Sequence, residues 1–202
     1  MTSDQSAPKA TIESASFNRP CTGERRSGDG SVVRQQDDKL FLAIIDILGH
    51  GLEAYEDAVR AMNFLSDNWT TDVTETMRLF HDHMKGTRGA AAGLAVLDTT
   101  SGQLSYTGVG NTVIRCFGKE ERRLLSADGI VGSIMRDPVV QNLQVQNGDV
   151  LILYTDGIRD NIQVADFPQL LYQNVRHVAR RFVMEFGKPY DDASCIVLRY
   201  ET

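Results

Sequence analysis

Three aspartates occupy the same kind of place in this sequence, at one end of a strongly apolar segment. Asp46 ends FLAIID, Asp156 ends VLILYTD, and Asp191 opens DDASCIVL. A carboxylate at the end of a buried strand loses hydration, so it needs a cation or another partner. The repeated placement therefore indicates a cation site, although a strand-end Asp followed by Gly is also ordinary turn chemistry. Spacing alone does not show that the three side chains converge.

Glycines follow two of these aspartates. Gly49 and Gly51 come after Asp46, and Gly157 comes directly after Asp156. Without a side chain, the backbone at these positions can approach an ion or a phosphate closely. Carboxylate oxygens, with water in the remaining positions, suit Mg²⁺ or Mn²⁺.

His50 is set apart from the other histidines by its two glycine neighbours. It could orient a water or donate to a phosphate, or it could be an ordinary loop histidine. His81 and His83 are two residues apart, which points them to different faces of a helix, and His177 lies among polar helical positions. These three are therefore expected to be solvated side chains.

Other catalytic templates are absent from the sequence. It contains no GxxxxGK[ST] loop and no GxSxG nucleophile turn. Gly108-Val109-Gly110 is followed by a strand pattern, where a dinucleotide-binding loop requires a helix. The sequence therefore gives no support for a P-loop nucleotide site, a dinucleotide-binding site or a serine-based catalytic triad.

Length and composition indicate a soluble globular protein. The 202 residues predict a loose tail over 1–12 and a single domain over 13–202. No apolar run approaches the roughly 20 residues that span a bilayer, and the polar N-terminus lacks the pattern of a secretory signal, so we expect a cytoplasmic protein. The net charge of −6 argues against a nucleic-acid partner.

The cysteines indicate neither a disulfide framework nor a zinc site. Cys21, Cys116 and Cys195 are odd in number, lie far apart and form no CxxC pair. We expect isolated reduced thiols.

Hydrophobic periodicity predicts two strands and then two helices in the first half of the chain. SVVRQQDDKLFLAIID reads as two strands, and its unbroken FLAII run indicates burial on both faces. Apolar residues recurring every three or four positions predict a helix from Leu52, and a second helix is expected over about 72–85.

The second half of the chain is mostly strand-like. AAGLAVLDTTSGQLSYTGVG predicts a hairpin, TVIRCFG and RRLLSA extend it, and Asn147-Gly148 predicts another hairpin. A long amphipathic helix over about 167–186 precedes a final strand. This order lacks the regular alternation of a parallel sheet, so we predict an α+β fold of antiparallel sheets covered by helices.

Five motifs, taken in order, resemble those of the metal-dependent PPM protein serine/threonine phosphatases, and within them the bacterial SpoIIE branch. They are SGD from Ser27, DILGHG from Asp46, GVGN from Gly108, GDVLILYTDGI from Gly148, and DDASCIVL from Asp191. The resemblance covers about residue 21 to the C-terminus. It implies a four-layer α-β-β-α sandwich of two antiparallel sheets flanked by helices.

The resemblance also implies a site for two divalent ions, Mn²⁺ or Mg²⁺. Asp46 is expected to bridge the ions through its carboxylate, with the Ile47 carbonyl as a further ligand. Asp156 and Asp191 are expected to bind from the other side, and Asp29 directly or through water.

Around these ligands the resemblance implies supporting roles. Asp192 is expected to adjust the substrate site without binding metal, and the bare turn at Gly49, Gly51 and Gly157 is expected to leave room for the phosphoryl group. His50 is a hypothetical general acid for the leaving oxygen. Many family members hold phosphate with an arginine upstream of the first acid, and here Arg25 or Arg26 lies near that place without a firm assignment.

The implied activity is hydrolysis of phosphoserine or phosphothreonine by a metal-activated water. The expected substrates are phosphorylated STAS-domain regulators of a bacterial stressosome or partner-switching pathway. Two alternatives share the site: a catalytically weak metal-binding module that docks on such regulators, and a phosphatase of small metabolites. The sequence gives no indication of oligomeric state.

Overall fold

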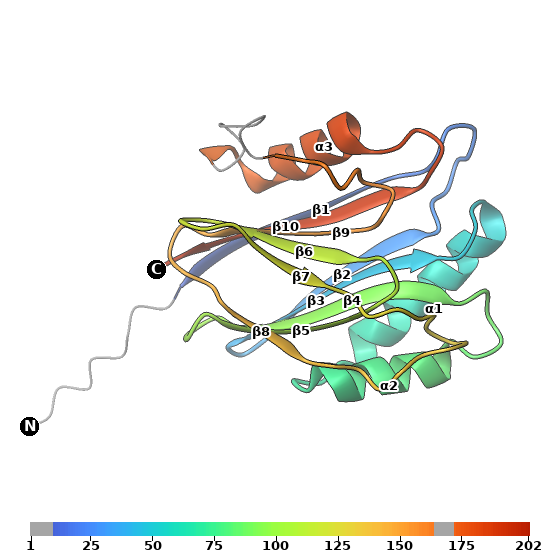
Figure 1. The fold of residues 1–202 in the computed structure, drawn as a ribbon, viewed down its shortest axis with the longest axis horizontal. Coiled ribbons are helices and arrows are strands. Elements are labelled where there is room, and N and C mark those ends of the chain that lie inside the picture. Colours follow the sequence, from blue (N-terminus) through green and yellow to red (C-terminus); the bar gives the residue numbers. More distant parts are fainter. Residues whose placement is uncertain (1–9, 164–171) are drawn as a thin grey trace, which may run out of the picture.

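Two antiparallel sheets lie face to face, and helices cover their outer faces (Figure 1). The computed structural model describes residues 10–163 and 172–202. One five-stranded sheet has the order β1-β10-β9-β6-β7, and the other has the order β2-β3-β4-β5-β8. The architecture is the predicted α+β sandwich with four layers.

The bounds of the elements follow the predicted order of strands, two helices, more strands, one helix and a last strand. The strands are β1 Thr11–Arg19, β2 Asp29–Gln36, β3 Lys39–Ile47, β4 Ala90–Asp98, β5 Gln103–Val109, β6 Val113–Phe117, β7 Arg122–Leu125, β8 Gln141–Gln144, β9 Val150–Tyr154 and β10 Ala193–Glu201. The helices in the described part of the chain are α1 Leu52–Asn68, α2 Val73–His83 and α3 Val175–Phe186.

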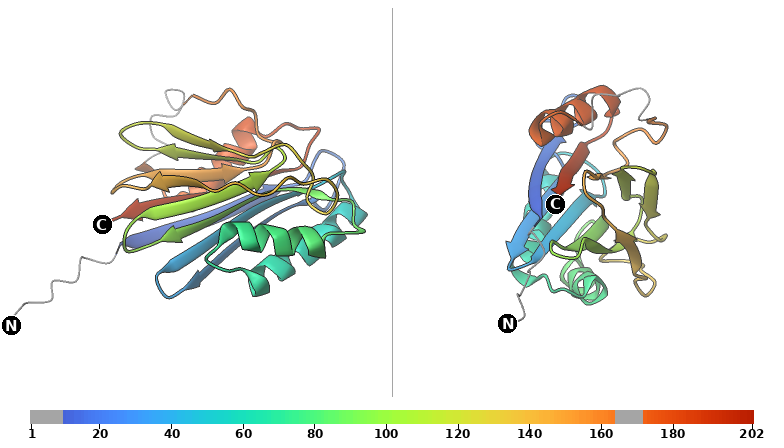
Figure 2. Two further views of the ribbon diagram at one scale, coloured as in Figure 1. Left: turned by 60° about the horizontal axis from the view of Figure 1, so that its bottom comes forward. Right: turned by 90° about the vertical axis from the view of Figure 1, so that its left-hand side faces the viewer.

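Three hydrophobic cores lie between the four layers. The right-hand view of Figure 2 shows these layers of helices and sheets end-on. One core lies between the helices α1 and α2 and the sheet that contains β3. The second lies between the two sheets, and the third lies between α3 and the sheet that contains β10. The sheets are therefore buried on both faces over much of their area.

The strand β3 shows how the sequence produces this arrangement. Phe41, Ala43 and Ile45 belong to the core under α1 and α2, whereas Leu42 and Ile44 belong to the core between the sheets. Successive side chains of a strand point to opposite faces, so an unbroken apolar run feeds two cores at once. The prediction of burial on both faces is confirmed.

The first two helices begin where the sequence predicts. The helix α1 starts at Leu52, and α2 follows Asp72, whose side chain accepts hydrogen bonds from the amides of Thr74 and Glu75. Within residues 10–163 and 172–202, none of the helices has the length and apolar character needed to cross a membrane.

The predicted start of the last helix is wrong. The helix α3 begins at Val175, eight residues after the predicted start at Phe167. The Asn174 side chain accepts a hydrogen bond from the Arg176 amide, and this cap sets the first turn. The expected apolar positions Leu170 and Leu171 lie outside the described residues.

The strand β1 corrects the predicted boundary of the tail. Thr11 and Ile12 were expected in the tail, yet they pair with Glu201 and Tyr200 at the edge of a sheet. The segment TIESASFNR has few apolar residues, but it pairs with β10 along its length, and Ile12, Ala15 and Phe17 pack against the cores on its two faces. The division into a tail and one domain otherwise remains a prediction, since residues 1–9 lie outside the described part.

The predicted hairpin at Asn147-Gly148 is wrong. The strands on either side of it, β8 and β9, belong to different sheets. The Gly148 amide donates to the Tyr200 carbonyl at 2.8 Å, and the buried Asp149 carboxylate accepts from the Gln146 amide at 2.9 Å. The Asp149 amide also donates to the Gln146 carbonyl at 3.0 Å, which closes a tight turn, and the chain uses this turn to cross from one sheet to the other.

The three cysteines are free and buried, as expected. Cys21, Cys116 and Cys195 form no disulfide. Burial raises the pKa of both Cys116 and Cys195 to about 12, so these thiols stay protonated at neutral pH.

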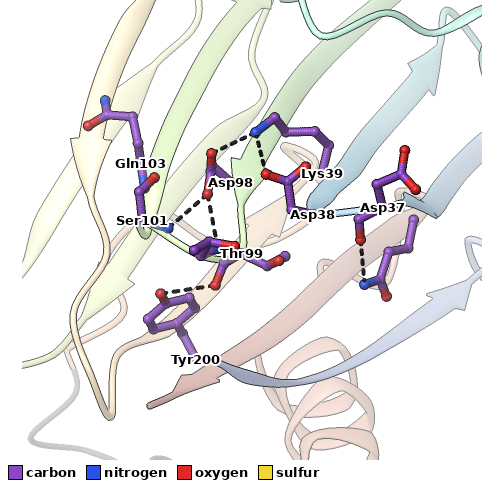
Figure 3. Close-up of polar contacts among 10 residues, drawn as sticks. Asp37, Asp38, Lys39, Asp98, Thr99, Ser101, Gln103 and Tyr200 are labelled. Atoms are coloured by element: carbon purple, nitrogen blue, oxygen red, sulfur yellow. Dashed lines mark hydrogen bonds and ion pairs between the residues drawn. The ribbon is translucent and has the colours of Figure 1, made fainter. Parts of the chain in front are cut away.

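A polar cluster ties the β4–β5 turn to both sheets (Figure 3). The Asp98 carboxylate accepts from the Lys39 ammonium at 2.6 Å and from the amides of Thr100 and Ser101. The Tyr200 hydroxyl of the facing sheet donates to the Thr99 carbonyl at 3.3 Å. The turn is thereby fixed at the end of the sandwich where β10 finishes.

We expect Asp98→Asn to weaken the fold in a pH-dependent way. The hydrogen bond from Lys39 and those from the turn amides lower the pKa of Asp98 to about 2. A carboxyl group whose folded pKa is depressed stabilises the fold above its unfolded pKa of about 4, and this contribution is lost as the pH falls toward 2. Urea unfolding should show a loss of about 1–2 kcal/mol at pH 7 and a smaller loss at pH 3. An equal loss at both pH values would contradict this role of the charge.

Candidate active site

Acidic side chains from both sheets gather at one end of the sandwich. In the antiparallel register, Asp29 at the start of β2 is the partner of Asp46 near the end of β3. Asp156 follows the end of β9, and Asp191 precedes the start of its neighbour β10. Figure 1 shows these strand ends on the side away from the chain's C-terminus. The fold therefore brings together residues that are far apart in the sequence.

Asp46 is the centre of this group. Burial raises its pKa to about 8, and the neighbouring charges of Asp156, Asp191 and Asp192 add to the effect. Asp156 and Asp191 are therefore near enough to Asp46 for their charges to act on it, while the shared site of the three acids stays a prediction.

Asp29 is fully enclosed between the two sheets. Its Oδ2 accepts a hydrogen bond from the Thr155 hydroxyl at 2.6 Å, and its backbone carbonyl accepts one from Asn18 at 2.7 Å. Burial raises the pKa of Asp29 well above its usual range, and the charge of Asp46 adds to this. Thr155 and Asn18 belong to the opposite sheet or follow it directly, so Asp29 joins the two layers at the site.

Asp156 and Asp191 lie side by side on the other sheet. The Asn111 amide donates to Asp156 Oδ2 at 2.7 Å. Burial raises the pKa of Asp191, the Asp156 charge raises it further, and Lys188 opposes the rise. The Arg19 guanidinium donates to the carbonyls of Lys188 and Asp191, which fixes the backbone before β10.

Asp192 contacts backbone. Its Oδ1 accepts from the Cys21 amide at 2.7 Å and its Oδ2 accepts from the Gly28 amide at 2.6 Å. The buried carboxylate therefore fastens the segment that leads into Asp29. This contact agrees with a supporting position beside the site, while the expected part of Asp192 in substrate binding stays a prediction.

The glycines do two different things. Gly49 and Gly51 have positive φ values of 90° and 84°, which side chains rarely adopt, and they form the turn between β3 and α1. At Gly157, an added Cβ would lie 1.7 Å from the Asp192 carbonyl oxygen. Gly157 thus permits two backbones to touch, whereas the sequence suggested room for a ligand there.

His50 projects from the glycine turn into solvent. Its Nδ1 lies 3.0 Å from Oε1 of Glu24, and its side chain is 66% exposed. Arg26, one of the two candidate phosphate-binding arginines, lies over the Tyr55 ring at 4.5 Å. The general-acid role of His50 remains a hypothesis. The structure adds Glu24 as the neighbour of its ring.

The chemistry of the donor set fits a hard divalent cation. Among residues 10–163 and 172–202, no three His, Cys, Asp or Glu side chains already stand in the arrangement of metal ligands. The charges of Asp156 and Asp191 nevertheless raise the pKa of Asp46, and the charge of Asp156 raises that of Asp191. Such shifts indicate negative charges that have no positive partner. A divalent ion among carboxylate oxygens would reverse that repulsion.

Several residues of the site were not predicted. Thr155 and Asn111 hold Asp29 and Asp156, and both stand inside motifs that the sequence already marks, YTDG and GVGN. Glu24 carried no signal of its own, because its neighbour His50 lies 26 positions away in the chain. Hydrogen-bond partners of this kind become visible only in the folded molecule.

An α-β-β-α sandwich with acids from both sheets gathered at one end defines a phosphatase of the PPM type. Within that class the chain belongs to the SpoIIE family. The family model described as stage II sporulation protein E matches residues 36–201.

Individual relatives agree with this placement. Phosphoserine phosphatase RsbX of Bacillus subtilis is 24% identical over 138 residues, which cover 67% of this chain and 69% of that protein. The structure of RsbX in complex with magnesium superposes with a TM-score of 0.81 at 20% identity, covering 94% of this chain and 96% of that one. The catalytic domain of PstP in complex with manganese has a TM-score of 0.70 at 14% identity, covering 96% and 100%. These two likenesses establish the fold.

A further solved structure is more similar in sequence. It comes from work described as "The bacterial stressosome: a modular system that has been adapted to control secondary messenger signaling". It is 28% identical with a TM-score of 0.87, and the match covers 94% of this chain and all of that chain.

We expect Asp46→Asn to stabilise the protein at alkaline pH in a chelating buffer. The folded pKa of Asp46, about 8, exceeds the unfolded value, so the wild type should lose stability as the pH rises from about 4 to about 8. The variant lacks this charge and should be more stable by about 2 kcal/mol at pH 8. Added Mn²⁺ should reverse the order, because it stabilises only the protein that binds it. Thermal unfolding with EDTA or Mn²⁺ measures both effects, and a variant that is less stable in both buffers would contradict the assignment.

Proposed function

We propose that this protein is a Mg²⁺- or Mn²⁺-dependent phosphatase that removes phosphate from phosphoserine or phosphothreonine of STAS-domain regulators. The pathway would be a bacterial stressosome or a partner-switching module. The observation that carries the proposal is the gathering of acids from both sheets around Asp46, where burial and repulsion raise its pKa to about 8.

Two divalent ions would be held by the carboxylates of Asp46, Asp156 and Asp191 and by the Ile47 carbonyl, with Asp29 as a ligand directly or through water. Ions bound in such a site supply a nucleophilic water and neutralise charge on the transferring phosphoryl group.

The remaining residues position and protect these groups. Asn111 orients the Asp156 carboxylate through its hydrogen bond, and Thr155 does the same for Asp29. The turn at Gly49 and Gly51 leaves the backbone bare beside Asp46, where a phosphoryl group can approach.

His50 would be the general acid for the leaving oxygen. The Glu24 carboxylate, 3.0 Å from Nδ1, would hold the ring in place at the rim of the turn. Donation of a proton from the ring to the serine or threonine oxygen avoids release of an alkoxide.

The choice of substrate rests on the relatives. RsbX is described as a phosphoserine phosphatase, and the relative of 28% identity comes from work on the stressosome. The alternative that shares the site is a catalytically weak module that binds metal and docks on the same regulators.

Substitution of the acids should abolish phosphate release. We expect Asp46→Asn and Asp156→Asn to lower the rate of manganese-dependent dephosphorylation of a phosphorylated STAS-domain protein by at least about 10³-fold, because the ions and the charge that they supply are lost. Asp67→Asn, at an exposed position of α1, is the matched control and should retain the wild-type rate.

Calorimetry beside the rate measurement separates the enzyme from the docking module. With Mn²⁺ present, it shows whether the phosphorylated partner binds. A partner that binds tightly and keeps its phosphate would support the docking module and overturn the enzyme.

The role of His50 can be tested with two leaving groups. We expect His50→Ala to lower kcat on a phosphoserine protein by about 10²-fold, and to have little effect on p-nitrophenyl phosphate, whose leaving group needs no proton. An equal loss on both substrates would contradict a general-acid role.

A further inference from the structure

Arg88 lies directly opposite the glycine turn of the acidic site. The pairing of β3 with β4 ends at Ile47 and Ala90. Beyond it the Leu48 amide still donates to the Gly89 carbonyl at 3.0 Å. The next step of the same register sets Arg88 against the residue that follows Leu48, which is the first glycine of the turn.

The side chain of Arg88 covers that glycine. A Cβ added at Gly49 would lie 3.1 Å from Arg88 Nη1, which is tighter than an ordinary contact. The guanidinium group therefore rests above bare backbone, three residues after Asp46. A glycine at this position is favoured by its φ of 90°, which side chains rarely adopt.

The present partner of Arg88 is a carboxylate in the first turn of α1. The guanidinium forms an ion pair with Glu53. The Arg88 side chain is 40% exposed and the Glu53 side chain 76% exposed, so the pair lies in solvent, where such pairs contribute little stability. A phosphate dianion carries more charge than a carboxylate and accepts two parallel hydrogen bonds from a guanidinium. Exchange of one anion for the other is therefore favourable.

Two other cations near the acids have contacts of their own. Arg26 lies over the Tyr55 ring, and Lys188 counteracts the raised pKa of Asp191. The helix α1 adds to the attraction for an anion, because its N-cap is Gly51, which has no side chain to accept from the first-turn amides.

We propose that Arg88 is the phosphate-binding residue of this site and that Glu53 holds it at the rim until a phosphoserine dianion takes the place of the carboxylate. This inference rests on the proposed phosphatase function, because it assigns the group that binds the substrate of that reaction. It places the phosphate-binding cation on the segment before β4, whereas the sequence suggested one upstream of the first acid.

The first test is kinetic, with the full chain, Mn²⁺ and p-nitrophenyl phosphate. We expect Arg88→Ala to raise KM and the inhibition constant of inorganic phosphate by about tenfold to a hundredfold, the usual effect of losing a hydrogen bond to a charged group. Arg88→Lys should retain part of the affinity. Glu53→Gln also breaks the ion pair, but it should lower both constants, because no carboxylate then competes with phosphate for Arg88.

Arg60→Ala is the matched control. Arg60 lines the same open groove as Glu53 and Arg88, and its own partner is Asp57 at 3.9 Å. Its removal changes the local charge by the same amount as removal of Arg88. It should leave KM and the inhibition constant of phosphate at the wild-type level. Thermal unfolding of each variant shows whether it is folded.

The second test measures binding without turnover. Inorganic phosphate titrated into the magnesium-loaded protein should bind more weakly to Arg88→Ala than to the wild type or to Glu53→Gln. If the wild type binds phosphate in this way and hydrolyses no phosphoprotein, the proposed function fails and the assignment of Arg88 stands. If Arg88→Ala and Glu53→Gln weaken binding equally, or if Arg88→Ala has no effect, Arg88 has only a structural role and the assignment is overturned.

Discussion

The repulsion among buried carboxylates at one end of the sandwich is the constraint on which the rest of the site depends. Burial raises the pKa of Asp46 to about 8 and also raises that of Asp29. Holding like charges in a space with little water costs folding free energy. The two large sheets, each buried on both faces, provide the cohesion that offsets this cost. The same repulsion gives the site its attraction for divalent cations.

Hydrogen bonds across the two sheets give the site its geometry. Thr155 reaches Asp29 from the opposite sheet, and the Asp192 carboxylate holds the backbone at Cys21 and Gly28. At the far end of the sandwich, Tyr200 makes a similar link to Thr99. The sheets are thus fixed to one another at both ends, so the acids on one sheet keep their position relative to those on the other.

The rim of the site is more exposed than its floor. Asp29 is buried, whereas Glu53, Arg88 and His50 lie largely in solvent. Groups that hold ions need a rigid enclosure, and groups that meet a protein substrate must be reachable. A buried acidic floor with an exposed rim of ion-paired side chains satisfies both needs.

The sequence by itself determined most of the elements and pointed to the acids. An unbroken apolar run such as FLAII specifies a strand with two buried faces, and periodicity places α1 and α2 to within a residue or two, because both signals are local. The ordered motifs also carried the resemblance that pointed to Asp46, Asp156 and Asp191.

Only the tertiary structure decided how these pieces meet. The turn at Asn147-Gly148 was read correctly as a turn, but strand pairing depends on distant partners, and Gln144 pairs with Gln103 in the other sheet. The strand β1 was missed because Ile12, Ala15 and Phe17 are too few to give a clear pattern, and its pairing with β10 fixes it in the folded molecule. The contacts of Asp29 with Thr155 and of Arg88 with Glu53 join residues 126 and 35 positions apart. Such contacts leave no local trace in a sequence, because they form only when packing brings the segments together.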